Sequence, residues 1–159
     1  MGRPPSDFGV ESEPFGPRPH VMIAGAKHPL ARSKHVSKSE LAKQKFIVRE
    51  EGSGTRNIFE YFFNAEMIQT PKITVEMGSN ETIKQAVMAG LGLSLISAHS
   101  IASEVAVRRL VVLKVEGLPI VRQWFVVNRA DRELPPACRA LRTFIVTKGR
   151  TFHPEHGKA

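Results

Sequence analysis

The residues best suited to chemistry lie between positions 48 and 56, where an apolar run leads into glycines, hydroxyl side chains and an arginine. This order predicts a strand, a turn and the start of a helix. A helix start offers free backbone N–H groups and the positive end of the helix dipole, which attract anions. Ser53, Thr55 and Arg56 add donors, and Gly54 lets a ligand approach the backbone closely. The pattern favours an anion site, but it lacks the spacing and lysine of a P-loop, and a plain turn with a helix cap would use the same residues.

A second loop repeats this order, because Met77 ends an alternating apolar run and is followed by Gly78, Ser79 and Asn80. Ligands of open α/β sheets gather at the carboxyl ends of strands. Two such loops on neighbouring strands would face the same crevice, which strengthens the case for each of them. Ser79 is equally suited to a purely structural role as the cap of the following helix.

The elements that must position these loops follow from the hydrophobic periodicity. Strands are predicted over 20–25, 46–49, 71–77, 93–96, 110–115 and 124–128. Helices are predicted over 37–44, 79–90, 99–104 and 135–148, with one more after position 56 whose core face carries Ile58, Phe59, Phe62, Phe63 and Met67. Residues 1–18 are expected to be irregular. The alternation predicts an α/β fold with a mostly parallel sheet covered by helices on both faces.

The net charge is +8, from 23 Lys and Arg against 15 Asp and Glu, and hydrophobic residues make up 42% of the chain. This hydrophobic share supports a packed core, and no apolar run is long enough to span a membrane. The N-terminus does not resemble a secretory signal, so a cytoplasmic location without membrane contact is expected. The excess charge suits an anionic partner such as a phosphorylated metabolite, nucleic acid or an acidic protein, or it only keeps the surface solvated.

Signals for catalysis and for metal binding are poor. The single cysteine, Cys138, excludes an internal disulfide and is expected to be inert and partly buried. The nucleophile-elbow pattern G-x-S-x-G is absent, and His153 and His156 have no further ligands near them. Neither an enzyme, a metal site nor a cofactor is therefore expected, and Trp124 and the phenylalanines are expected to belong to the core.

Several stretches resemble the effector-binding domain of LysR-type transcriptional regulators. Residues 15–24 and 28–31 resemble the strand that crosses between the two lobes of that domain, and Gly52-Ser-Gly-Thr-Arg56 continues the family's order. Residues 83–96 are similar to the family signature V-x-x-G-x-G-[IL]-[AS]-x-[IL], although Ser97 stands where proline is usual. The resemblance runs in order over residues 10–147.

This resemblance implies a two-lobed fold like that of periplasmic binding proteins. It implies a first-lobe remnant with the crossover strand (1–25), a nearly complete second lobe that binds effector (26–119), a return strand and helix of the partial first lobe (120–148) and a loose polar tail (149–159). The implied effector residues are Ser53, Gly54, Thr55 and Arg56, with Ser79 and Asn80 as further candidates. Because the cleft lies between lobes in this family, weak effector binding by this chain alone is expected.

The resemblance also implies partners. Operator DNA would be read only through the winged helix-turn-helix of the family, which is missing from this sequence. Poorly covered apolar faces at Val21–Ile23, Trp124–Val127 and the last helix would favour a homo-oligomer through this domain.

Within the family, residues 115–129 and 76–81 resemble the branch that regulates RuBisCO operons, so the effector would be a phosphorylated metabolite or a nicotinamide nucleotide. Three other functions compete with this interpretation: a periplasmic-type solute-binding module, an enzyme acting on a phosphorylated substrate through the 52–56 loop, and a fragment that binds nucleic acid nonspecifically through its charge.

Overall fold

The computed structural model describes residues 2, 9–64 and 71–152 of the chain. The chain divides into two compact units. Unit 2 is Pro19–Ile120, and unit 1 combines Met1–Arg18 with Val121–Ala159. Because unit 2 contains both loops singled out above, its architecture decides how a site could be built.

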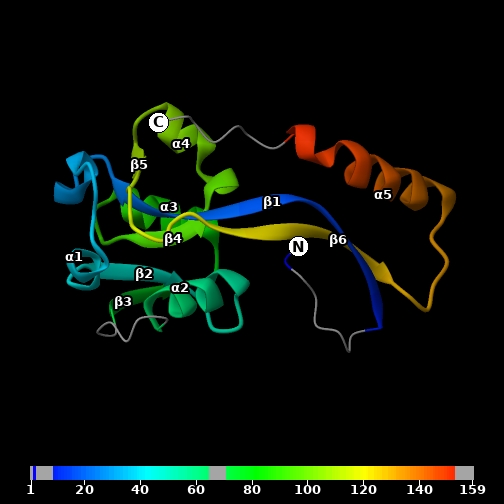
Figure 1. Cartoon of the computed structure of the whole chain (residues 1–159), viewed down its shortest axis with the longest axis horizontal. Coiled ribbons are helices and arrows are strands. Elements are labelled where there is room, and N and C mark those ends of the chain that lie inside the picture. Colours follow the sequence, from blue (N-terminus) through cyan, green and yellow to red (C-terminus); the bar gives the residue numbers. More distant parts are fainter. Residues whose placement is uncertain (1, 3–8, 65–70, 153–159) are drawn as a thin grey trace. The chain divides into compact units, whose positions relative to one another are not determined.

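Two sets of paired strands form the framework of unit 2 (Figure 1). The long strand β1 (Val10–Gly25) pairs antiparallel with β4 (Ser94–Ser97) on one side and with β5 (Leu110–Val112) on the other. Strands β2 (Lys45–Arg49) and β3 (Lys72–Met77) pair in parallel. A parallel bridge between Phe46 and Leu93 links β2 to the residues just before β4.

The expected α/β class is confirmed, but the expectation of a mostly parallel sheet is wrong for the strands around β1. Strands β4 and β5 both run antiparallel to β1, so the rule for parallel strands joined by a helical crossover does not apply to these pairs. The periodicity of a sequence reveals a strand but not the direction of its neighbours. The parallel prediction is correct only for β2 and β3 and for the bridge beside them.

The helices of unit 2 begin where the sequence offers caps. They are η1 (Pro29–Arg32), α1 (Lys38–Ala42), α2 (Gly54–Asn64), α3 (Asn80–Met88), η2 (Ala98–Ser100) and α4 (Ala102–Ala106). Ser37 and Glu40 form the predicted capping box at the start of α1, with each side chain accepting from the other residue's backbone N–H. The Ser79 hydroxyl accepts from the Thr82 N–H at 3.1 Å and caps α3, and Gly90 follows that helix with φ +82°.

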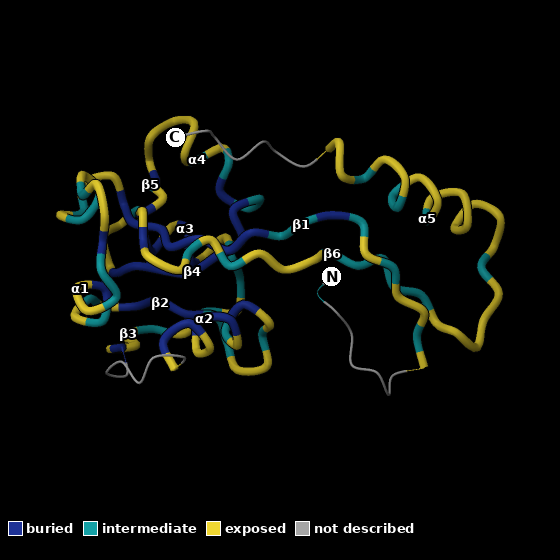
Figure 2. Tube along the Cα trace, viewed as in Figure 1, coloured by how far each residue is buried: buried dark blue, intermediate teal, exposed yellow. Residues whose placement is uncertain are grey.

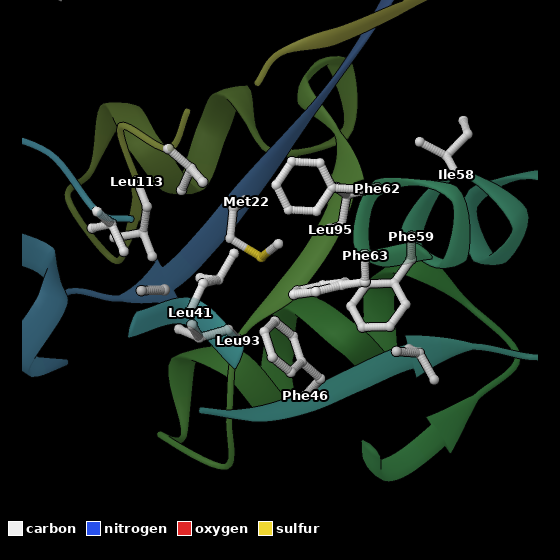
Figure 3. Packing of buried hydrophobic residues seen from close by; sticks show 14 residues of the cluster. Met22, Leu41, Phe46, Ile58, Phe59, Phe62, Phe63, Leu93, Leu95 and Leu113 are labelled. Carbon is white, nitrogen blue, oxygen red and sulfur yellow. The ribbon is translucent and has the colours of Figure 1, made fainter. Parts of the chain in front are cut away.

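Helices cover the strands on both faces, as predicted. Side chains alternate along a strand, and Met22 of β1 and Phe46 of β2 accordingly join a cluster with α2. Their neighbours Ile23 and Ile47 join a second cluster with α3. Figure 3 shows the first cluster, in which the Phe46 ring meets Phe59 and Phe63 edge-on at centroid distances of 5.2 and 5.3 Å.

The predicted core face of α2 is confirmed for Ile58, Phe59, Phe62 and Phe63, which are all buried. Met67 lies outside the described residues. The alternating residues of β3 behave differently, because Ile73 is 39% exposed. Strand β3 therefore contributes less to the core than its pattern predicted.

Unit 1 contains the first half of β1, all but the first residue of strand β6 (Ile120–Arg129), helix α5 (Pro136–Lys148) and the short helix η3 (Gly149–Phe152). Strand β6 pairs with β1. Residues 10–18 are thus a strand, and the expectation of an irregular segment there is wrong, because pairing with a partner more than 100 residues away leaves no local signal. The expected loose tail begins as η3, and residues 153–159 lie outside the described residues.

Burial departs from three further expectations. Val21–Ile23 are well covered, with at most 8% exposed, because β4 and β5 flank β1 and α3 packs beside it. Residues 124–127 are half-buried, so the expectation that Trp124 belongs to the core is wrong. Helix α5 has no buried residue, as expected for a poorly covered face, but Cys138 is exposed and not partly buried, and Phe144 is 46% exposed and not part of the core.

Candidate functional site

The two glycine-containing loops lie at the same edge of one strand pair. Arg49 ends β2 and Met77 ends β3, and these two residues are partners in the parallel register. The carboxyl ends of parallel neighbours face the same way, so the loops before α2 and α3 emerge side by side, which meets the condition set for a shared crevice. Both belong entirely to unit 2.

The first loop turns tightly into α2. Gly52 adopts φ +80°, a conformation that favours glycine, and the Ser53 N–H donates to the Glu50 carbonyl at 3.2 Å. The Ser53 carbonyl then accepts from the Asn57 N–H at 3.0 Å, which starts the helix. The N–H groups of the first helical turn have no acceptor within a helix. A side chain on Gly54 would meet no atom within 4 Å, so the backbone there is open to a ligand.

Arg49 connects the two loops, although the sequence marked it only as one of many basic residues. Its guanidinium donates to both carboxylate oxygens of Glu50 at 2.7 Å and to the Asn80 Oδ1 at 3.0 Å. The hydrogen bonds with Glu50 raise the pKa of Arg49, and the same bonds lower the pKa of Glu50. Arg49 therefore stays charged and joins the end of β2 to the start of α3.

Arg56 makes a second set of bridges from the first turn of α2. Its Nε donates to the Glu60 carboxylate at 2.6 Å, and its Nη1 donates to the Glu76 carboxylate at 3.2 Å and to the Arg49 carbonyl at 3.3 Å. Glu76 lies on β3, so this arginine also ties the two strands together. The candidate Arg56 is thus fixed in place by three acceptors.

The cluster has more negative than positive charge: two guanidiniums face three carboxylates. The arginine side chains are only 12% and 19% exposed, whereas the carboxylate side chains of Glu50, Glu60 and Glu76 are 40–47% exposed. The carboxylates can rotate into water at little cost, but the arginines are held. An incoming anion could therefore replace carboxylates on two guanidiniums that are already positioned.

The remaining predicted residues differ in how they could serve a ligand. Ser53 is half-buried at the turn, while Thr55 is only 3% exposed and contributes to the packing of α2. The Ser79 hydroxyl caps α3, which is the structural role left open by the sequence, and Asn80 accepts from Arg49. Sequence reasoning missed Arg49 and Glu76 as site residues, because each acts through a partner 20 or more residues away.

A separate hollow lies on unit 1, along one face of α5. It is lined by Pro136, Arg139, Ala140, Thr143, Phe144 and Thr147. Among the residues that the structure describes, all six lining residues belong to α5 and only Arg139 carries a charge.

Within residues 9–64 and 71–152, no group of three or more histidine, cysteine or carboxylate side chains is arranged to hold a metal ion. The His153 and His156 pair lies outside the described residues. None of the helices that the structure describes is both long enough and apolar enough to cross a bilayer.

The family follows from this fold together with the sequence. The model of the LysR substrate binding domain matches residues 1–150. The chain belongs to this family of ligand-binding domains, and its curated relatives are transcriptional regulators. Its fold is the periplasmic-binding-protein-like α/β fold of LysR effector-binding domains.

Among curated relatives, the chain is 49% identical over 156 residues to the HTH-type transcriptional regulator CbbR of Xanthobacter flavus, covering 98% of this chain and 47% of that protein. It is 46% identical over 153 residues to the RuBisCO operon transcriptional regulator of Allochromatium vinosum, covering 96% of this chain and 50% of that protein. The chain thus spans about half the length of the curated relatives it matches.

One solved structure is similar in both fold and sequence. The regulatory domain of CcmR from Synechocystis PCC6803, determined in complex with 2-PG, superposes with a TM-score of 0.83 at 34% identity. The match covers 92% of this chain and 70% of that one.

Proposed function

We propose that this chain is the effector-sensing part of a regulator of carbon-fixation (RuBisCO) operons, and that a small phosphorylated anion binds at the loops before α2 and α3. The observation that carries the proposal is the pair of held guanidiniums, Arg49 and Arg56, whose exposed carboxylate partners can be replaced. Support also comes from CbbR relatives and from the 2-PG complex of the CcmR domain.

The proposed ligand contacts combine charge with backbone donors. A phosphate group offers several acceptor oxygens, and arginine binds such groups through two parallel N–H donors. The phosphate group would contact the start of α2 through Ser53, Gly54 and Arg56. It would contact the start of α3 through Ser79 and Asn80. Thr55 would contribute mainly by packing.

Binding of an anion to these arginines would change the contacts of both loops. Arg49 now holds Glu50 and Asn80 together, so an anion that takes over this arginine would release the start of α3 from the end of β2. Arg56 would release Glu76 in the same way. Exchange of these contacts is a physical route by which an effector could change the conformation of a regulator.

The proposal also includes the cellular location, self-association and operator DNA. A regulator of this family would act in the cytoplasm, associate with further copies through this domain and reach its operator through a winged helix-turn-helix. No cofactor is proposed. Because an anion must displace the carboxylates that already pair with Arg49 and Arg56, we expect weak binding, with a dissociation constant of about 0.1–1 mM.

Isothermal titration calorimetry with 2-phosphoglycolate, the 2-PG of the CcmR complex, tests the proposal. Glycolate, which keeps the carboxylate and lacks the phosphate, is the matched control ligand. The wild-type chain should bind 2-phosphoglycolate and not glycolate, and Arg56→Gln and Arg49→Gln should each weaken binding at least about tenfold, or about 1.4 kcal/mol. Arg139→Gln on α5 removes the same charge outside the site and should bind normally.

The Gly54→Ala variant separates an effect on ligand binding from an effect on the stability of the protein. Apart from its chain neighbours and the backbone of its own helix, the new methyl group meets no protein atom within 4 Å, so the variant should unfold at the same temperature as the wild type while binding the anion more weakly. Equal binding by wild type, Arg49→Gln, Arg56→Gln and Gly54→Ala would refute this location for the site.

A further inference from the structure

A second group of cations gathers on unit 2, away from the loops that follow β2 and β3. Two chain segments, 26–35 and 107–115, lie beside each other at both of their ends. The Ala26 N–H donates to the Arg109 carbonyl at 3.3 Å, and the Val36 N–H donates to the Lys114 carbonyl at 2.9 Å. The segments carry six exposed cations, which we call the cationic strip: Lys27, Arg32, Lys34, Arg108, Arg109 and Lys114.

The charges of the cationic strip are uncompensated. Neither segment contains an aspartate or a glutamate. Within the part of the chain that the structure describes, none of the six cations forms an ion pair, in contrast to Arg49 and Arg56, which both pair with carboxylates. Figure 2 shows that much of both segments is exposed. Like charges held together on a surface repel one another, and an anionic partner would relieve this repulsion.

The spacing of the strip indicates an extended partner. Arg109 and Lys114 are five residues apart along a nearly extended segment, so their backbones are separated by roughly 16 Å at about 3.3 Å per residue. That distance is too long for all of the cations to converge on one small anion. It suits a polyanion, and duplex DNA carries one phosphate charge per about 1.7 Å of its axis.

We propose that the cationic strip binds the phosphate backbone of duplex DNA without reading its sequence. An acidic protein partner fits less well, because protein interfaces are depleted in lysine and centre on aromatic or large apolar anchors. Three of the six cations are lysines, and the large apolar side chains exposed in these segments are Val107 and Val112. This binding is independent of the proposed effector site and of any sequence-reading element.

Fluorescence anisotropy of the full 159-residue chain with a labelled random-sequence duplex, measured from about 25 to 200 mM salt, tests this proposal. The logarithm of the association constant should fall linearly with the logarithm of the salt concentration, with a slope of about −0.9 for each phosphate contacted. The strip variant carries Arg32→Gln, Lys34→Gln, Arg109→Gln and Lys114→Gln. The matched control removes four exposed cations elsewhere, through Lys72→Gln, Arg132→Gln, Lys148→Gln and Arg150→Gln.

Both variants lose four positive charges, so only position distinguishes them. The strip variant should bind at least about 100-fold more weakly at low salt, with a slope shallower by about 3, while the control stays within about fivefold of the wild type. Equal losses in the two variants would show that net charge alone attracts DNA and would overturn the proposal. An absence of DNA binding by the wild type at low salt would also overturn it. The proposal would equally fail if the strip variant still bound DNA but no longer bound a poly-glutamate peptide that the wild type binds, because the strip would then serve an acidic protein. Circular dichroism melts of both variants verify that they are folded.

Discussion

The two units of this chain differ most in what they bury. Every buried hydrophobic side chain within residues 9–64 and 71–152 lies in Pro19–Ile120, where two clusters pack on opposite faces of the strands. Helix α5 of unit 1 has none, and Leu141, Phe144 and Phe152 are 46–70% exposed (Figure 2). Burial of apolar area is the main stabilising contribution to a fold. Stability should therefore reside in unit 2, which also carries the held arginines.

The largest effect should come from the aromatic cluster of unit 2. Phe63 is 1% exposed and meets the rings of Phe46, Phe59 and Phe62. Phe63→Ala leaves a cavity and should lower the free energy of unfolding by about 3–5 kcal/mol. Urea denaturation followed by circular dichroism measures this. A loss below 1 kcal/mol would contradict the assignment of stability to this cluster.

The next effect concerns the ion pair between α3 and α4. Lys84 donates to Glu104 at 2.8 Å, and their side chains are 11% and 16% exposed. Burial works against the charge of Lys84, but its bonds to Glu104 and Glu81 outweigh it and raise the pKa of Lys84, while the bond from Lys84 lowers the pKa of Glu104. At pH 7, Glu104→Gln should cost about 2 kcal/mol, since removing one partner leaves a poorly solvated charge.

The pH dependence of that cost follows from the lowered pKa of Glu104. Its stabilisation is fully present above the unfolded-state pKa of about 4.3 and is lost as the pH falls through the lower folded-state pKa. The difference in unfolding free energy between wild type and Glu104→Gln should therefore shrink below about pH 4. A difference that is constant from pH 7 to pH 3 would exclude a role for the carboxylate charge.

A smaller loss of stability is expected from a substitution at Gly92, where two backbone segments of unit 2 approach each other closely. A methyl group on Gly92 would lie 2.7 Å from the Lys45 carbonyl oxygen, so Gly92→Ala must displace backbone and should cost about 1–2 kcal/mol. Gly54→Ala provides the matched control, because the space around Gly54 is open, and it should change stability by less than about 0.5 kcal/mol. Similar thermal shifts for both variants would argue against this packing.

The smallest effect should come from unit 1. Phe144 is 46% exposed and its ring meets Phe152 at 5.7 Å, so Phe144→Ala should cost less than about 0.5 kcal/mol in dilute solution. A loss as large as that of Phe63→Ala would mean that α5 is covered in solution. Repeating the melt at several protein concentrations would then distinguish coverage by a second copy, which makes the melting temperature rise with concentration.

The two units also differ in how much of their fold could be predicted from the sequence. The caps at Ser37 and Ser79 and the apolar face of α2 were predictable, because their signals span only a few residues. The first half of β1 was not predictable, and neither was the antiparallel direction of β4 and β5, since both depend on pairing between strands far apart in the sequence.

The candidate site was predictable to a similar degree. Its two loops followed from local glycine and hydroxyl patterns, and their adjacency followed from the parallel pairing of β2 with β3. The carboxylates that neutralise the arginines were not foreseen. Arg49 reaches Asn80 across 31 residues and Arg56 reaches Glu76 across 20, and no short pattern encodes such contacts.

An NMR titration of the ¹⁵N-labelled full chain with 2-phosphoglycolate tests the proposed effector site most directly, because it reports on each backbone amide separately. The largest shifts should fall on residues 49–56 and 78–81, with small changes in the cationic strip and in α5. Shifts centred on the cationic strip or on α5, or no shifts at millimolar ligand, would contradict an effector site at the held arginines of unit 2.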